Sequence, residues 1–273
     1  MNITLLGDIA GRMTQDSAGA DRVTVAVACI PSGATNYIRK LIPNTCPKWS
    51  QATDAHVGLI VKLLRKEAFA ISAMSVNKAT FEWEDFWSEA AKTHRRISDE
   101  AKGSVSVLKA ATMVKFALFG QCSSLAVAHS IKTNKFPRPA SKNHVLHVRE
   151  AHIYDKEIEG NENIKAFSEF WQERNRHQPL VSLFGVKLET VSISHETEQG
   201  ERLLLLADYV AGIAHAANSG ADTLSKSSVS RDCAQRAHAD LCGTSKYTEV
   251  SEDFDFRYHD IFPAFAPGFE QAR

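Results

Sequence analysis

The sequence contains few cysteines, and they follow no pairing pattern. Five cysteines are scattered over 273 residues, and no two of them form a C-x-x-C pair. This spacing disfavours a zinc ribbon and thioredoxin-type redox chemistry. We therefore expect reduced thiols, as in most intracellular proteins, with Cys29 and Cys122 in apolar surroundings.

The sequence also lacks long hydrophobic runs. The N-terminal apolar run stops at Asp8 and has no basic segment before it, which is unlike a secretory signal peptide. The longest apolar stretch, residues 203–217, contains Asp208 and is shorter than the ~20 residues that a membrane-spanning helix needs. These features predict a cytoplasmic protein with no membrane partner.

An excess of charge of either sign is missing as well. The 32 Lys and Arg residues balance 32 Asp and Glu residues, so the net charge is 0. This balance argues against nucleic-acid binding driven by global positive charge, although it leaves local charged sites open. An apolar fraction of 44% with 23% charged residues is ordinary for a globular protein and excludes a disordered chain.

Three common catalytic motifs are also absent from the sequence. No G-x-x-x-x-G-K-S/T occurs, so nucleotide hydrolysis of the P-loop class is not supported. No G-x-S-x-G indicates a serine hydrolase, and no H-E-x-x-H indicates a zinc protease.

The residues that are present predict alternating strands and helices. β-branched and apolar runs indicate five strands, at residues 3–7, 22–30, 68–76, 144–154 and 186–193. Helical periodicity favours helices at residues 55–66, 81–92, 98–131, 161–177, 201–218 and 225–241, with a loop at 132–142. Gly103 and Gly120 are positions where the segment 98–131 could divide into two helices. This order predicts an α/β fold with a mixed sheet of about five strands flanked by helices.

The C-terminal part of the sequence has a weaker pattern. We expect one domain over residues 1–218, followed by a helical and aromatic extension over residues 219–273. The extension is expected to pack on the domain, because a solvated tail rarely carries so many phenylalanines.

Three carboxylates stand out from their apolar surroundings. Asp8 follows the first predicted strand, Asp155 follows the fourth, and Asp208 interrupts an apolar helix. If these two strands are adjacent and parallel, their carboxyl ends open onto one crevice, where Asp8 and Asp155 face each other. Crowded acids repel one another unless a hard divalent cation binds them, and two such ions are suited to phosphodiester hydrolysis. The alternatives are a turn or cap role for Asp8 and Asp155, and a surface position for Asp208.

Other side chains are weaker candidates for the same site. Glu157 is either a fourth metal ligand or a solvated loop acid, and His195 and His215 are potential proton shuttles. A basic loop is a candidate for binding a phosphate backbone, unless it is only solvated; it contains Lys132, Lys135, Arg138 and Lys142.

The stretch EQGERLLLLADYVAG, residues 198–212, resembles the C-terminal signature of the domain-of-unknown-function 3800 family of bacteria and phages. That signature typically reads Leu-Gln-Leu-Ala-Asp followed by two hydrophobic residues and Ala. Family members begin with a strand that ends in Asp-Glu-Ser-Gly, and Asp8-Ile9-Ala10-Gly11 is the equivalent here. A further family strand ends in Asp before a helix, which Tyr154-Asp155-Lys156-Glu157 resembles. The resemblance covers roughly residues 1–218.

This resemblance implies a ribonuclease-H-like fold and a metal-dependent nuclease that acts on nucleic acid. It also implies that Asp8, Asp155 and Asp208 bind Mg²⁺ or Mn²⁺. The sequence departs from the family at Ile9, Ala10 and Leu205, where an acid, a hydroxyl and Gln are usual. The departures motivate an alternative: a catalytically inactive member that binds a protein partner or a second copy, within a phage or defence-related assembly.

Overall fold

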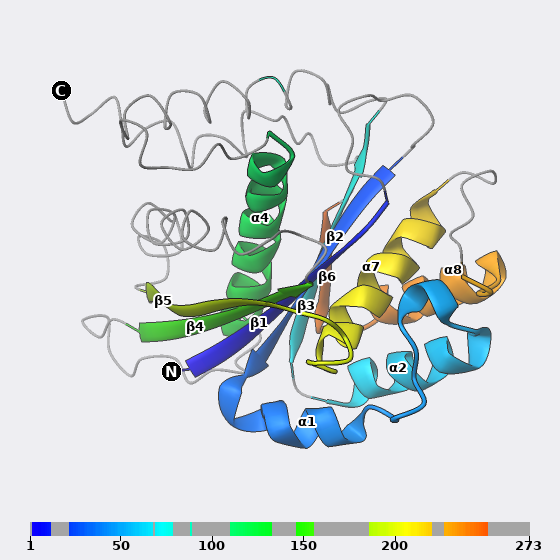
Figure 1. Cartoon of the computed structure of the whole chain (residues 1–273), viewed down its shortest axis with the longest axis horizontal. Helices are drawn as coiled ribbons and strands as arrows, with labels where there is room; N and C mark the ends of the chain where they lie inside the picture. Colours follow the sequence, from blue (N-terminus) through cyan, green and yellow to red (C-terminus); the bar gives the residue numbers. More distant parts are fainter. Residues whose placement is uncertain are drawn as a thin grey trace.

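Six strands form one mixed sheet in the order β5-β4-β1-β2-β3-β6 (Figure 1). The strands are β1 (Asn2–Ala10), β2 (Arg22–Pro31), β3 (Ala70–Asn77), β4 (Leu146–Asp155), β5 (Val186–Glu196) and β6 (Tyr247–Val250). β1, β2 and β3 run antiparallel in succession, whereas β4 is parallel to β1, β5 to β4, and β6 to β3. This computed structural model describes residues 2–11, 22–67, 69–78, 88, 110–132, 146–155, 186–219 and 227–250.

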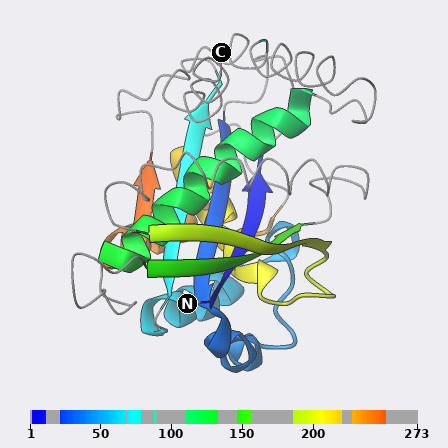
Figure 2. The same cartoon turned by 90° about the vertical axis from the view of Figure 1, so that its left-hand side faces the viewer.

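Helices cover both faces of the sheet. α4 (Ala110–Lys132) crosses one face, and α7 (Leu204–Asn218) lies on the other, against β1 and β2 (Figures 1 and 2). α2 (Asp54–Lys66) and α8 (Arg231–Cys242) pack against each other on the same side as α7. A short helix α1 (Thr35–Leu41) and the 3-10 turns η1 (Ser32–Ala34) and η2 (Trp49–Gln51) connect β2 to α2. Because α7 lies between the sheet and α8, most of its circumference is apolar and buried.

The two central strands explain the most apolar parts of the sequence. Residues 23–30 of β2 are all buried, because helices cover both faces of this central strand. β1 and β4 approach closely at Gly7, which pairs with Tyr154. A Cβ at Gly7 would lie 2.5 Å from Tyr154 Cδ1 and 2.9 Å from Phe119 Cε1, so only glycine fits at this position. This close contact precedes Asp8 and Asp155 by one residue on each strand.

The α/β architecture with a mixed, helix-flanked sheet is confirmed, although several of its elements differ from the prediction. β1 does not stop at Gly7 but continues through Asp8 to Ala10, because these residues still pair with β2. α4 is continuous through Gly120, where no break occurs. The helix α1 and the sixth strand β6 were not predicted. Residues 227–250 also join the main fold, since α8 packs on α7 and α2, and β6 pairs with β3; the division at residue 218 stays a prediction.

Several predicted segments lie outside the described residues. These are the helices at 81–92 (apart from residue 88) and 161–177, the first part of the helix at 98–131, the loop beyond residue 132 and the tail at 251–273. Among the described residues, no helix has both the length and the apolarity needed to cross a membrane.

Candidate metal centre

The strand geometry places Asp8 and Asp155 on the same face of the sheet. Leu6 belongs to the apolar core that includes α7, and Ile153 packs against that core. Side chains alternate between faces along a strand, so Asp8 and Asp155, each two residues further on, also face α7. β1 and β4 are adjacent and parallel, as the shared crevice requires. Both acids are only 6% exposed.

Asp208 approaches the same region from α7. It is half-buried, and its Oδ2 accepts a hydrogen bond of 2.6 Å from the backbone N–H of Trp49. The backbone N–H of Ile9 makes a similar contact, of 2.6 Å, to Oδ1 of Asp8. In Asp8 and in Asp208, a backbone amide therefore fixes one carboxylate oxygen. The second oxygen of each carboxylate takes no part in that hydrogen bond.

Glu198 completes the group and was not predicted from the sequence. One ligand atom from each of Asp8, Glu198 and Asp208 lies within 4.8 Å of the other two. Glu198 belongs to the turn between β5 and α7. A signal was available, because an acid just after a strand parallel to β4 must lie at the same edge of the sheet as Asp155. Glu157, the fourth ligand expected from the sequence, lies outside the described residues.

The charges of the acids in this site raise one another's pKa values. Burial, followed by the charges of Asp208 and Asp155, raises the pKa of Asp8 well above its ordinary value. Burial also raises the pKa of Asp208 to about 7; the Trp49 hydrogen bond offsets part of this rise, and the charges of Glu198 and Asp155 add to it. Asp155 thus acts on both acids through its charge, although it is not a member of the closest group.

A cleft of about 540 Å³ opens beside these acids. Asp155 and Glu198 line it together with polar and basic side chains, among them Lys48, Gln51 and Arg202. Carboxylates next to cationic and amide groups suit an anionic ligand. A cation bound to the acids would bridge them to that ligand.

The loop that forms one wall of the cleft is anchored to α7 and to the turn before it. The Tyr209 hydroxyl donates to the Pro47 carbonyl at 3.0 Å and accepts from Cys46 Sγ at 3.3 Å. The Arg202 guanidinium donates to the carbonyls of Pro43 and Cys46. These bonds hold the loop in the position from which the Trp49 amide reaches Asp208.

Gly212 allows Trp49 to sit there. The Trp49 ring packs directly on α7 at Gly212, where a Cβ would lie 2.2 Å from Trp49 Cδ2. Gly212 therefore makes room for Trp49 against α7.

The two candidate proton shuttles lie outside the acidic group. His195 pairs with Tyr154, whose ring contacts Gly7 and Phe119, so alternation directs His195 to the α4 face, away from Asp155. His215 Nδ1 lies 3.4 Å from the Thr24 hydroxyl. The basic residues Lys135, Arg138 and Lys142 lie outside the described residues, as does the side chain of Lys132.

All five cysteines are free thiols, and Cys29 and Cys122 are buried.

No known protein-family model and no curated protein sequence matches the chain.

Proposed function

We propose that this protein is a divalent-metal-dependent phosphodiesterase that cleaves nucleic acid, built on a ribonuclease-H-like fold. The observation that carries the proposal is the convergence of Asp8, Glu198 and Asp208, with one ligand atom each within 4.8 Å. Carboxylate oxygens are the ligands that Mg²⁺ and Mn²⁺ prefer in proteins.

The protonation behaviour of the site supports a bound cation. Burial and mutual repulsion raise the pKa of Asp8 and of Asp208, so ionising all the acids together is unfavourable without a positive charge. A divalent cation would supply that charge and hold the carboxylates ionised. The arrangement of acids on β1, β4 and a later helix also supports the ribonuclease-H-like expectation.

Each residue of the site has a role in this proposal. Asp8, Glu198 and Asp208 would hold Mg²⁺ or Mn²⁺, with Asp155 beside them. Such ions activate a water molecule and stabilise the leaving oxygen of a phosphodiester. The amides of Ile9 and Trp49 orient two of the carboxylates, and Lys48 and Gln51 line the cleft where the phosphate backbone would bind.

Cleavage of single-stranded, double-stranded and hybrid substrates with Mg²⁺ or Mn²⁺ tests the proposal. We expect Asp208→Asn to lower the cleavage rate at least about 100-fold, because the exchange removes a ligand charge from the site. Asp240→Asn is the matched control, since this exposed aspartate pairs only with Arg65 among the ion pairs described. The absence of both cleavage and calorimetric metal binding in the wild-type protein would overturn the proposal.

One observation favours the second candidate, a catalytically inactive binding protein. Ile9 follows Asp8 where the family has an acid, and it contributes a backbone N–H rather than a further ligand. If Asp208→Asn abolishes metal-dependent cleavage while the variant stays folded, the enzyme hypothesis is correct. If the wild-type protein does not cleave nucleic acid and Asp208→Asn releases a co-purifying partner, the binding-protein hypothesis is correct.

A further inference from the structure

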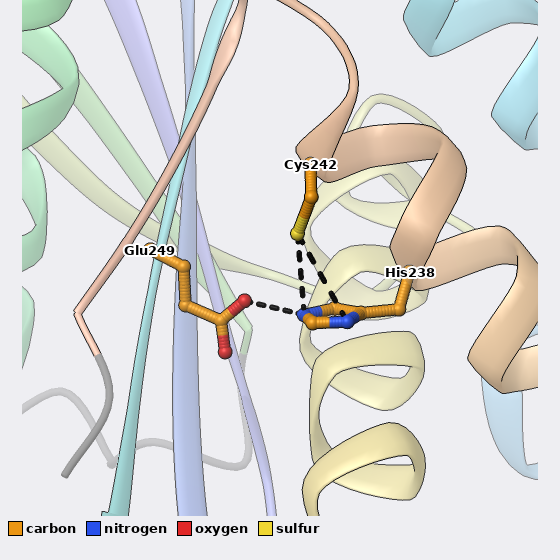
Figure 3. A group of neighbouring side chains, drawn as sticks. All are labelled: His238, Cys242 and Glu249. Carbon is orange, nitrogen blue, oxygen red and sulfur yellow. Dashed lines mark hydrogen bonds and ion pairs between the residues drawn. The ribbon is translucent and has the colours of Figure 1, made fainter. Parts of the chain in front are cut away.

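A second group of potential metal ligands lies by the edge strand β6, away from the acidic centre. It consists of His238 and Cys242 on α8 and Glu249 on β6, with one ligand atom from each within 4.8 Å of the others (Figure 3). β6 is three strands away from β1, which corresponds to about 14 Å at ordinary strand spacing. The nuclease proposal does not use these residues.

The helix places two of the donors side by side. His238 and Cys242 are four residues apart on α8, so they lie on one face of the helix in consecutive turns. Cys242 Sγ is 3.7 Å from His238 Nε2. In a tetrahedral zinc site, bonds of about 2.3 Å to sulfur and 2.05 Å to nitrogen separate these two atoms by about 3.6 Å. The separation of the two donor atoms therefore matches that of a zinc site. Because Sγ lies nearly as close to His238 Nδ1, at 4.0 Å, one of the two side chains must turn before both bind one ion.

Glu249 meets the same histidine from the neighbouring strand. Its Oε2 lies 2.5 Å from His238 Nε2, as a direct hydrogen bond (Figure 3). A shared zinc ion would replace that bond and separate the two atoms to about 3.4 Å, a shift of about 1 Å at the end of a flexible side chain.

The surroundings of Glu249 resemble the support that metal-binding carboxylates receive. The Tyr247 hydroxyl donates to Oε2 at 2.8 Å, and Asn218 Nδ2 donates to Oε1 at 2.7 Å. These two hydrogen bonds orient the carboxylate before any ion binds.

The chemistry of the donors selects the kind of ligand. Thiolate and imidazole are softer ligands than the carboxylates of the acidic centre, and together with one carboxylate they suit zinc rather than magnesium. A catalytic thiol is the other use for a Cys-His-Glu arrangement. The distances from Cys242 Sγ to the imidazole nitrogens of His238, 3.7 and 4.0 Å, are longer than the hydrogen bond through which a base activates a nucleophile.

We propose that His238, Cys242 and Glu249 form a binding site for a divalent transition metal of the zinc class, which links α8 to β6. Three protein ligands would leave a fourth coordination position for water or another ligand. The ion would fasten the short strand β6 to the helix that covers it.

Cobalt substitution tests this proposal in the full chain. The protein is stripped with a chelator and titrated with Co²⁺, and the thiolate-to-cobalt charge-transfer absorption is recorded, followed by displacement with Zn²⁺. We expect this absorption to saturate at one equivalent in the wild-type protein and to disappear in Cys242→Ser. It should persist in Cys233→Ser, which exchanges another thiol of the same helix, and in Asp208→Asn, which alters only the acidic centre.

A supporting hydrogen bond provides a second test that leaves all three ligands in place. Tyr247→Phe removes only the hydroxyl that donates to Glu249, and we expect zinc affinity to fall about 10-fold. If the wild-type protein shows no thiolate-to-cobalt absorption, or if Cys242→Ser retains it, His238 and Glu249 form an ion pair only and the proposal is wrong. Because Asp208→Asn is measured in both assays, failure of this site is distinguishable from failure of the nuclease.

Discussion

Gly212 couples the packing of Trp49 to the position of the Asp208 carboxylate. Gly212→Ala would place a methyl group 2.2 Å from Trp49 Cδ2, and the Trp49 amide is the group that holds Asp208. We expect a loss of about 1–3 kcal/mol in the free energy of unfolding, typical of overpacking, together with weaker metal binding. Urea denaturation and calorimetry measure the two effects.

Gly58→Ala is the matched control for this exchange. Gly58 is exposed on α2, and nothing lies within 4 Å of a Cβ built there. Alanine favours a helix by up to about 1 kcal/mol over glycine, so this variant should be more stable than the wild-type protein. Equal stability of the Gly212→Ala and wild-type proteins would show that Trp49 moves away at no cost.

The raised pKa of Asp208 predicts how stability depends on pH. The pKa rises from 3.8 in the unfolded chain to about 7 in the folded protein, so the folded state binds the proton more tightly. Without metal, the contribution of Asp208 to the free energy of unfolding should therefore be greatest at acidic pH and should fall by a few kcal/mol as the pH rises from about 4 to about 7. Urea denaturation in the presence of a chelator, across this range, measures the slope.

Asp208→Asn is the control, because asparagine does not titrate. We expect this variant to lose a large part of the fall in stability between about pH 4 and pH 7, while the share due to Asp8 remains. Saturating Mn²⁺ should flatten the slope in the wild-type protein as well, because a bound cation favours the ionised form. If stability depends on pH in the same way in the wild-type and Asp208→Asn proteins without metal, the raised pKa does not belong to Asp208.

At the scale of elements, Ser230 fastens α8 to α2. Its hydroxyl caps α8 by accepting the Cys233 N–H at 3.2 Å, and its hydroxyl and backbone N–H both donate to Asp54 at the start of α2. We expect Ser230→Ala to lower the free energy of unfolding by about 0.5–2 kcal/mol, as loss of an N-cap usually does. Thermal denaturation measures the change, with the nearby exposed Ser228→Ala as the control; equal effects of the two exchanges would contradict this role.

How far an element could be predicted depends on how much of it is buried. β2 and α2 bury long apolar runs, and their predicted bounds differ from the structure by one residue at most. α1 buries only Ile38 and β6 only Tyr247, so neither produces a periodic pattern in the sequence. Pairing of the β1 backbone with β2 extends β1 to Ala10, and backbone pairing does not depend on whether a side chain is apolar.

The residues of the candidate metal centre could be predicted only where their sequence neighbours are apolar. Asp8, Asp155 and Asp208 stand out because each adjoins or interrupts an apolar run, and a buried charge needs a reason. Glu198 sits among polar turn residues, so nothing local sets it apart, and the only signal is its place just after a strand parallel to β4. The Trp49 amide is invisible to side-chain patterns, because it is a backbone group positioned by the contact with Gly212.

At the scale of the whole molecule, the net charge of 0 limits how a nucleic acid could be attracted. A neutral chain offers no general attraction to phosphate, so the proposed function depends on bound cations and on the few basic side chains of the cleft, such as Lys48 and Arg202. Only a small number of phosphates would then be contacted, and few counterions would be released on binding.

This reasoning predicts an affinity for nucleic acid that depends strongly on divalent metal and only weakly on salt. For a non-cleavable oligonucleotide with Mn²⁺, we expect the affinity to fall less than about 100-fold between 50 and 200 mM monovalent salt, as expected for about three phosphate contacts. Fluorescence anisotropy measures the affinity, and a chelator should abolish binding. A fall of about 1,000-fold or more, or binding that survives the chelator, would mean that a basic surface rather than the acidic centre holds the nucleic acid.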